Sequence, residues 1–285
     1  MQNDRGPAAP ARSLHFSTGR AMEKNRIERC MKGSTMPQYT IHPIVVGTKL
    51  FDQSMMTYQY GQGKPYTIPI YCWYLEGGER TVLVDTGEMN PIRSADREAA
   101  IGGKIYTFEQ GLDRWGLKPE DIEVVIHTHL HNDHCENDYK CTRAKIYVHE
   151  RELTQIHNPH PLDFRYLEDY ISEVEENAQI HVVTKDGPIL PGIELIHTPA
   201  HTPGGLSVAV TTPKGKAIIT GCCTIDQNYF PPKEITAMEM EVIPPGTHVN
   251  AYESYDILMK LKAMADILIP LHEPRFAAID TIGRD

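Results

Sequence analysis

Four side chains that can bind a metal lie within six consecutive residues of this 285-residue chain: His129, His131, Asp133 and His134. They follow the apolar run 122–126, which predicts a short buried strand. Alternate residues of an extended chain point to the same side, so His129 and His131 share one side and the next turn brings Asp133 and His134 beside them. Imidazole and carboxylate groups bind divalent metals, and paired metals lie about 3.5–4 Å apart. The spacing predicts a two-metal site; the alternative is a histidine-rich surface turn.

Two divalent metals in such a site would catalyse hydrolysis. They lower the pKa of bound water toward ~7 and polarise a carbonyl or phosphoryl oxygen. The nucleophile is then metal-bound hydroxide, and Asp133 is the candidate catalytic residue that handles the proton afterwards. The expected partner is a small-molecule substrate.

The composition excludes several other classes of protein. The chain has 38 Asp and Glu against 28 Lys and Arg, a net charge of −10, so it lacks the basic face that nucleic-acid binding needs. No apolar run approaches the ~18 residues that span a membrane. Six cysteines are too few for a disulfide scaffold of this length, which predicts a cytoplasmic protein with free or metal-bound thiols. The sequence is also compatible with a homo-oligomer.

The elements that must position these ligands fall into two groups. The first has strands predicted at 44–50, 69–75, 80–85 and 122–126, with a helix at 108–117 and a mobile loop at 51–66. The second has strands predicted at 145–149, 193–197, 206–211, 216–220 and 267–271, with helices at 150–156, 167–177 and 251–265. Two runs of strands, each closed by helices, predict an α/β fold of the αββα sandwich type.

Residues 1–35 differ from the rest of the chain. They contain seven Lys and Arg against three Asp and Glu and show neither helical nor strand periodicity. We therefore expect a disordered N-terminal extension at 1–35 and a single hydrolase domain at 36–285.

Four motifs resemble those of the metallo-β-lactamase superfamily. The run 129–134 resembles its His-x-His-x-Asp-His signature, and 83–87 (LVDTG) resembles an early turn of the family. The run 198–204 (TPAHTPG) resembles its TPGHTPG loop, with Ala200 in place of a glycine, and 270–272 (PLH) resembles its last strand-end histidine. The resemblance covers about residues 44–274 and implies the αββα metallo-β-lactamase sandwich.

The resemblance also implies a ligand set. It assigns His129, His131 and His201 to one metal, and Asp133, His134 and His272 to the other. It places Asp85 behind them, orienting a ligand or its loop, where the alternative is a plain turn-capping role. The expected cofactors are two divalent metal ions, with zinc favoured and iron or manganese as alternatives.

The chain departs from the family after the predicted strand 216–220. Most hydrolases of the family have a metal-bridging aspartate there, but this sequence reads Gly221-Cys222-Cys223. One class of β-lactamases in the superfamily has a zinc-binding cysteine at this point, which implies Cys222 as a thiolate ligand of the second metal and favours zinc. Cys223 is then expected to point away and pack; the alternative is that Cys222 is only a small buried residue.

Within the superfamily the sequence most resembles the N-acyl homoserine lactonases, at 116–122, 145–152 and 229–272. Those lactonases hold the lactone carbonyl with a tyrosine whose position here is Ile225, so Tyr229 is the candidate for that catalytic role. An apolar substrate wall is predicted from Met55, Met56, Tyr58, Tyr229 and Phe230. The predicted function is a metal-dependent hydrolase that opens a lactone or cleaves an ester-type carbonyl. The alternatives are a thioesterase, a β-lactamase-like enzyme, a phosphoesterase and a non-catalytic metal-binding regulator.

Overall fold

The structure is a computed structural model that describes residues 36–284. The extension predicted at 1–35 lies outside the described residues. In the described part of the chain, no helix combines the length and the apolar character that crossing a membrane requires.

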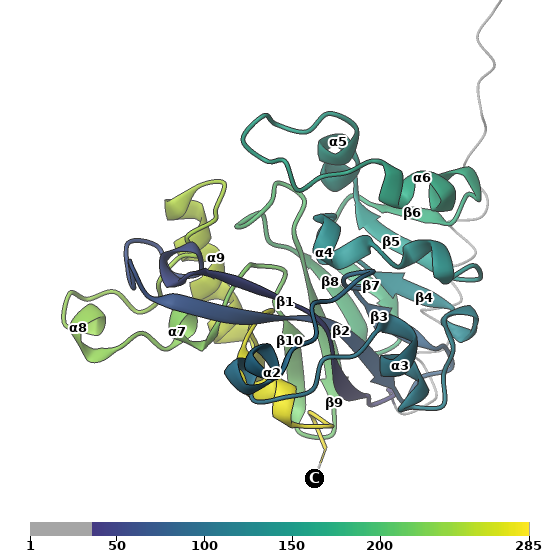
Figure 1. Cartoon of the computed structure of the whole chain (residues 1–285), viewed down its shortest axis with the longest axis horizontal. Helices are drawn as coiled ribbons and strands as arrows, with labels where there is room; N and C mark the ends of the chain where they lie inside the picture. The colour runs from purple at the N-terminus through teal and green to yellow at the C-terminus, as the bar shows by residue number, and fades with distance from the viewer. Residues whose placement is uncertain (1–35, 285) are drawn as a thin grey trace, which may run out of the picture. The chain divides into compact units, whose positions relative to one another are not determined.

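The first sheet has six strands in the order β1-β2-β3-β4-β5-β6 (Figure 1). They are β1 (Thr40–Asp52), β2 (Pro65–Glu76), β3 (Val82–Val84), β4 (Val124–Ile126), β5 (Lys145–His149) and β6 (Ile180–Val183). Pairing is antiparallel from β1 to β3 and parallel from β3 to β6. The parallel strands β3 to β6 therefore have their carboxyl ends on the same side of the sheet, and the histidine run 127–134 follows the carboxyl end of β4.

The second sheet has five strands in the order β11-β10-β9-β8-β7. They are β7 (Gly187–Leu190), β8 (Ile193–His197), β9 (Leu206–Thr212), β10 (Gly215–Ile219) and β11 (Ile267–Ile269). Only β10 and β11 pair in parallel. The loop that contains His201 joins β8 to β9, and His272 follows β11.

The two sheets pack face to face, because their inward side chains form one apolar cluster. Val82 and Val84 of the first sheet share this cluster with Val208 and Val210 of the second. The outer face of the first sheet packs on α3 (Phe108–Asp113), α5 (Glu150–His157) and α6 (Asp169–Glu176). The outer face of the second sheet packs on α9 (Ala251–Met264). This arrangement confirms the predicted αββα sandwich.

The remaining helices are short and lie in connections. They are α2 (Ala95–Ile101), α4 (Asn132–Cys135), α7 (Asp226–Tyr229) and α8 (Lys233–Thr236). The first strand starts earlier than predicted, and β6, β7 and these four short helices were not predicted. The segment predicted as a mobile loop is shorter, since β1 extends to Asp52 and β2 begins at Pro65. Its start is held by the Asp52 side chain, which accepts hydrogen bonds from the backbone of Ser54 and Gly63.

Candidate metal centre

The two sheets meet where the predicted ligands emerge. The Leu206 N–H, at the start of β9, donates to the Thr128 carbonyl, one residue before His129, at 2.8 Å. This bond links the histidine loop of the first sheet to the second sheet. Because His201 lies only five residues before Leu206, histidines that are distant in the sequence come together here.

Three buried histidines form the centre of the site. One ring nitrogen from each of His129, His131 and His201 lies within 4.8 Å of the other two. His201 Nε2 is 3.2 Å from His131 Nδ1, and the ring of His129 lies 4.6 Å and 5.0 Å from those of His131 and His201. Three imidazoles that converge in this way match the histidine ligand sets of divalent metals.

Three further predicted ligands lie beside this triad. The ring of His134 is 4.1 Å from that of His129 and 5.3 Å from that of His272. Asp133 Oδ1 is 3.9 Å from His134 Nε2. The structure therefore brings together all six histidine and aspartate side chains of the predicted ligand set, although their metal binding stays a prediction.

Each of the five histidines has one ring nitrogen next to an oxygen atom. The pairs are His129 Nδ1 with Thr128 Oγ1 (3.0 Å), His131 Nε2 with Asp163 Oδ2 (3.0 Å), His134 Nδ1 with Asp85 Oδ2 (2.8 Å), His201 Nδ1 with the Thr247 carbonyl (2.6 Å) and His272 Nδ1 with the Pro69 carbonyl (3.0 Å). A carbonyl or carboxylate oxygen can only accept, so the nitrogen facing it must be the N–H. The Thr128 hydroxyl donates its hydrogen to Asp85, so it too accepts from His129. The other nitrogen then carries a lone pair. The donor set thus fits a divalent metal.

Burial also favours the neutral form of these rings. It lowers the pKa of His129 and His201 well below the ordinary value, and the neighbouring histidines add to the effect. It lowers the pKa of His272 to about 4. Burial also lowers the pKa of His134, but Asp85 and Asp133 outweigh this and raise it above the ordinary value. Neutral imidazole is the form that binds metals, so the lowered pKa values favour the ligand form of His129, His201 and His272.

Asp85 supports the site from behind and is fully buried. It accepts hydrogen bonds from the Thr128 N–H (2.8 Å) and hydroxyl (2.7 Å) as well as from His134. Burial raises its pKa, but His134 and His127 outweigh this and hold the pKa below its ordinary value. Asp85 therefore stays ionised and fixes both the loop and the orientation of His134.

His127 has a different role from the other histidines of the run. Both of its ring nitrogens face carboxylates, Asp138 at 2.8 Å and Asp85 at 3.4 Å. Burial lowers its pKa, but Asp138 and Asp85 together raise it to about 10. His127 is therefore a cation buried between two anions and has no lone pair for a metal. Nothing in the pattern of residues around Asp138 indicates this role.

A loop between α5 and α6 also contacts the site. Asp163 accepts from His131 and from Arg165 Nε (2.7 Å), and the ring of Tyr166 lies 4.6 Å from that of His131. Sequence reasoning missed these residues because nothing in their spacing or composition marks them.

Cys222 and Tyr229 pack in an apolar environment. Both are fully buried in the apolar cluster outside the second sheet, with Leu258 and Leu261 of α9. Burial raises the pKa of the Cys222 thiol to about 12. This packing is what the alternative reading of Cys222 as a small buried residue expects, and the roles predicted for Cys222 and Tyr229 stay predictions.

Cys223, expected to point away, lies nearer the site. Its thiol packs against Met56, with the two sulfur atoms 3.9 Å apart. Burial raises its pKa to about 12, while Thr247 and Arg165 lower it and Asp133 raises it further. Thr247 is the residue whose carbonyl accepts from His201, so Cys223 shares neighbours with the predicted ligands.

The residues of the predicted apolar wall do not form one surface. Met56 is buried, whereas Met55, Tyr58 and Phe230 are exposed. Tyr58 instead makes an edge-to-face contact with His248, with ring centres 4.9 Å apart.

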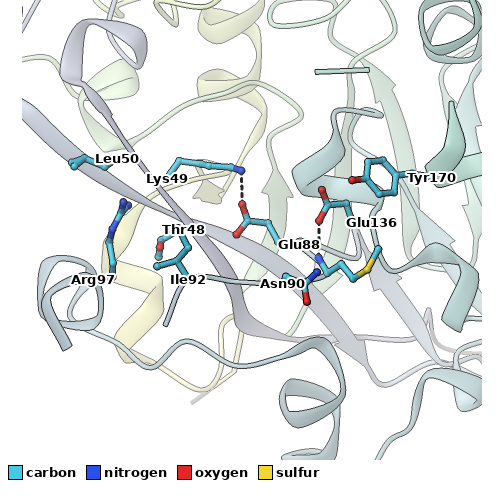
Figure 2. A pocket seen from close by; sticks show the side chains of 10 residues that line it. Thr48, Lys49, Leu50, Glu88, Asn90, Ile92, Arg97, Glu136 and Tyr170 are labelled. Carbon is cyan, nitrogen blue, oxygen red and sulfur yellow. Dashed lines mark hydrogen bonds and ion pairs between the residues drawn. The ribbon is translucent and has the colours of Figure 1, made fainter. Parts of the chain in front are cut away.

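A cavity of about 390 Å³ is lined by residues that include Lys49, Glu88 and Glu136. Figure 2 shows Lys49 and Glu88 pointing toward each other at its centre, with Glu136 and Tyr170 on one side and Arg97 on the other. Burial lowers the pKa of Lys49, but the Glu88 and Asp133 carboxylates outweigh this and raise it above the ordinary value. The cavity thus has four charged lining residues, Lys49, Glu88, Arg97 and Glu136, and none of the residues of the predicted apolar wall.

Comparison with known proteins gives a consistent result. Residues 66–265 match the metallo-beta-lactamase superfamily. An N-acyl homoserine lactonase from Bacillus sp is 28% identical over 202 residues, which cover 65% of this chain and 74% of the relative. The N-acyl homoserine lactonase AiiB of Agrobacterium fabrum is 25% identical over 185 residues, covering 58% of this chain and 67% of the relative.

A solved structure with a similar fold is an N-acyl homoserine lactone hydrolase with N-hexanoyl-L-homoserine at its catalytic metal centre. Its TM-score is 0.63 at 23% identity, and the match covers 84% of this chain and 94% of the other. AidC, a dizinc quorum-quenching lactonase, has a TM-score of 0.59 at 12% identity, with 85% and 92% of the two chains covered. At these identities the likeness concerns the fold.

Proposed function

This chain belongs to the metallo-β-lactamase superfamily, and from that membership we propose that it is a metal-dependent hydrolase that opens a lactone or cleaves an ester-type carbonyl substrate. The observation that carries the proposal is the set of five buried histidines, each with one ring nitrogen next to an oxygen atom, three of which bring a ring nitrogen within 4.8 Å of one another. The lactonase relatives favour a lactone or ester over a thioester, a phosphoester or a β-lactam.

His129, His131 and His201 would hold one divalent metal, and Asp133, His134 and His272 a second. When bound, such metals supply Lewis acidity and lower the pKa of water. The imidazole-rich donor set suits zinc, with iron and manganese as the alternatives. Two metals agree with AidC, which is a dizinc lactonase.

The chain's own residues would then orient the substrate and move the proton. Burial raises the pKa of Asp133, but His134 and Lys49 outweigh this and hold it below the ordinary value. Its ionised carboxylate can take the proton that remains on the added oxygen after the attack and pass it to the leaving oxygen. Lys49 borders the cavity next to Asp133, where its ammonium can donate to a substrate oxygen.

Metal analysis of the purified protein followed by a substrate panel tests this proposal. We expect close to two divalent metals per chain and metal-dependent hydrolysis of a lactone or ester, in a panel that also contains thioesters and organophosphates. Chelation should abolish turnover, and adding zinc back should restore it. A fully loaded protein that turns over no member of the panel would instead support a non-catalytic metal-binding regulator.

Lys49→Met is expected to lower kcat/KM by about 10–100-fold, the loss of one charged hydrogen bond to the substrate. Metal content should stay at the wild-type level, because Lys49 is not among the proposed ligands. Glu88→Gln is the companion variant, since it breaks the ion pair but keeps the ammonium, and it should retain most activity. Lys104→Met, which removes an exposed lysine paired with Glu98, is the matched control. Equal kcat/KM in Lys49→Met and the wild type would contradict this role.

The prediction that Cys222 is a ligand requires a thiolate-to-cobalt absorption band near the ultraviolet in the cobalt-loaded protein. The band should vanish in Cys222→Ser and survive in Cys223→Ser. Loss of the band in Cys223→Ser alone would assign the ligand to Cys223, whose neighbours include Asp133 and Thr247. Absence of the band from the wild type would mean that both thiols only pack.

A further inference from the structure

Glu152, on α5, is a carboxylate that is only 1% exposed and is not among the proposed ligands. Its Oε2 accepts from the Leu130 N–H, and its Oε1 accepts from the Gly204 N–H, both at 2.9 Å. The Tyr166 hydroxyl also donates to Oε2 at 2.9 Å. Each of the two carboxylate oxygens therefore accepts a hydrogen bond from a backbone N–H group.

The two backbone groups belong to the two loops that carry the histidine triad. Leu130 lies between His129 and His131, in the loop that follows β4 of the first sheet. Gly204 lies three residues after His201, in the loop between β8 and β9 of the second sheet. Glu152 belongs to neither loop, so one side chain from a third element fixes the two loops relative to each other.

The close contact between Gly204 and Glu152 leaves no space for a side chain at residue 204. A Cβ at this position would lie 2.6 Å from the Glu152 backbone nitrogen and 2.9 Å from its Oε1. Tyr166 holds the same carboxylate from the other side while its ring contacts that of His131. Gly204 and Tyr166, which both lie near the triad, thus hold the Glu152 carboxylate in its position.

We propose that Glu152 is a positioning residue that sets the separation of His201 from His129 and His131, and thereby the metal affinity of the triad. This inference rests on the proposed function, since it requires the triad to bind a metal. Residues that orient metal ligands typically change metal affinity by about 10–100-fold when they are replaced. A buried carboxylate that served packing alone could be replaced by an apolar side chain at little cost, whereas this one satisfies two buried N–H groups.

Glu152→Gln tests the proposal, because it keeps the size of the side chain but turns one acceptor into a donor that faces a backbone N–H. We expect the Kd for Co²⁺ to rise about 10–100-fold and the visible cobalt spectrum to change. Glu150→Gln, at an exposed position on the same helix, should leave both unchanged. Gly204→Ala places a Cβ against the same carboxylate, from the loop that contains His201, and should also raise the Kd for Co²⁺. This second variant tests the proposal if Glu152→Gln does not fold.

The unfolding temperatures with and without metal separate positioning from general stability. If Glu152 positions the ligands, the rise in Tm on adding Co²⁺ is smaller in Glu152→Gln than in the wild type. If Glu152 only supports the fold, the substitution lowers the Tm of the metal-free and the Co²⁺-loaded protein by the same amount and leaves the Kd for Co²⁺ unchanged. That result would overturn the proposal. A wild-type protein that binds no Co²⁺ would contradict the proposed function instead.

Discussion

Replacing both His129 and His131 with alanine is expected to remove at least one of the two metals and to lower kcat/KM by at least about 10⁴-fold, a loss typical of removing the main source of an enzyme's rate enhancement. Both rings belong to the triad whose nitrogens lie within 4.8 Å of one another, and His201 alone cannot replace them. Metal content measured by atomic emission checks the first part, and hydrolysis of the best substrate of the panel checks the second.

The matched control is His157→Ala/His160→Ala, which removes two exposed histidines. It should keep its metals and its activity. Circular dichroism of the His129→Ala/His131→Ala protein shows whether the fold is retained, so that metal loss is not confused with unfolding. Full metal occupancy in this folded variant would refute the assignment of the triad.

Asp85→Asn is expected to lower the free energy of unfolding by about 3–5 kcal/mol, the usual cost of breaking a buried charge pair by removing one partner. Asp85 has a backbone φ of 58°, a conformation that asparagine tolerates, so the substitution tests the charge rather than the backbone. The amide would leave the buried, charged His127 with one carboxylate instead of two, and would no longer offer two acceptors to Thr128 and His134.

Urea unfolding of the chelator-treated protein measures this effect without any contribution from metals. Asp96→Asn, an exposed carboxylate in the first turn of α2, should change stability by less than about 0.5 kcal/mol. A similarly small change in Asp85→Asn would mean that the carboxylate only caps its turn, the alternative left open by the sequence.

The predictable part of the site is the part that depends on local sequence. The run 129–134 follows a buried strand, so its exit from the sheet and the grouping of its side chains follow from alternation and one turn. The strands 145–149 and 193–197 match β5 and β8 because each is a short apolar run with clear ends. The αββα architecture follows from the order of such elements.

Cys222 shows where alternation stops being reliable. Strand β10 ends at Ile219, and residues 221–223 form bends rather than extended chain. The rule that neighbouring side chains point to opposite sides therefore no longer gives the direction of Cys222 or Cys223. The direction of Tyr229 could not be predicted either, because it lies at the end of the short helix α7 and packs in the cluster that contains Leu258 and Leu261 of α9.

Asp163 and Glu152 could not be found as supporting residues from the sequence, because their roles depend on contacts between distant segments. Asp163 meets His131 across 32 residues, and Glu152 meets Gly204 across 52 residues. A loop aspartate and a helical glutamate have ordinary compositions and spacings. Their roles become visible only when both sheets are in place.

Each sheet comes from one continuous half of the described chain, since the first sheet ends at Val183 and the second begins at Gly187. During synthesis His129 and His131 are made well before His201, and the strand β9 that brings the His201 loop to them is made later still. An emerging chain that has reached only residue 183 therefore holds two members of the triad, both belonging to one sheet. The complete triad exists only after the second half has folded and docked. Metal binding by all three histidines therefore requires the whole sandwich to be assembled.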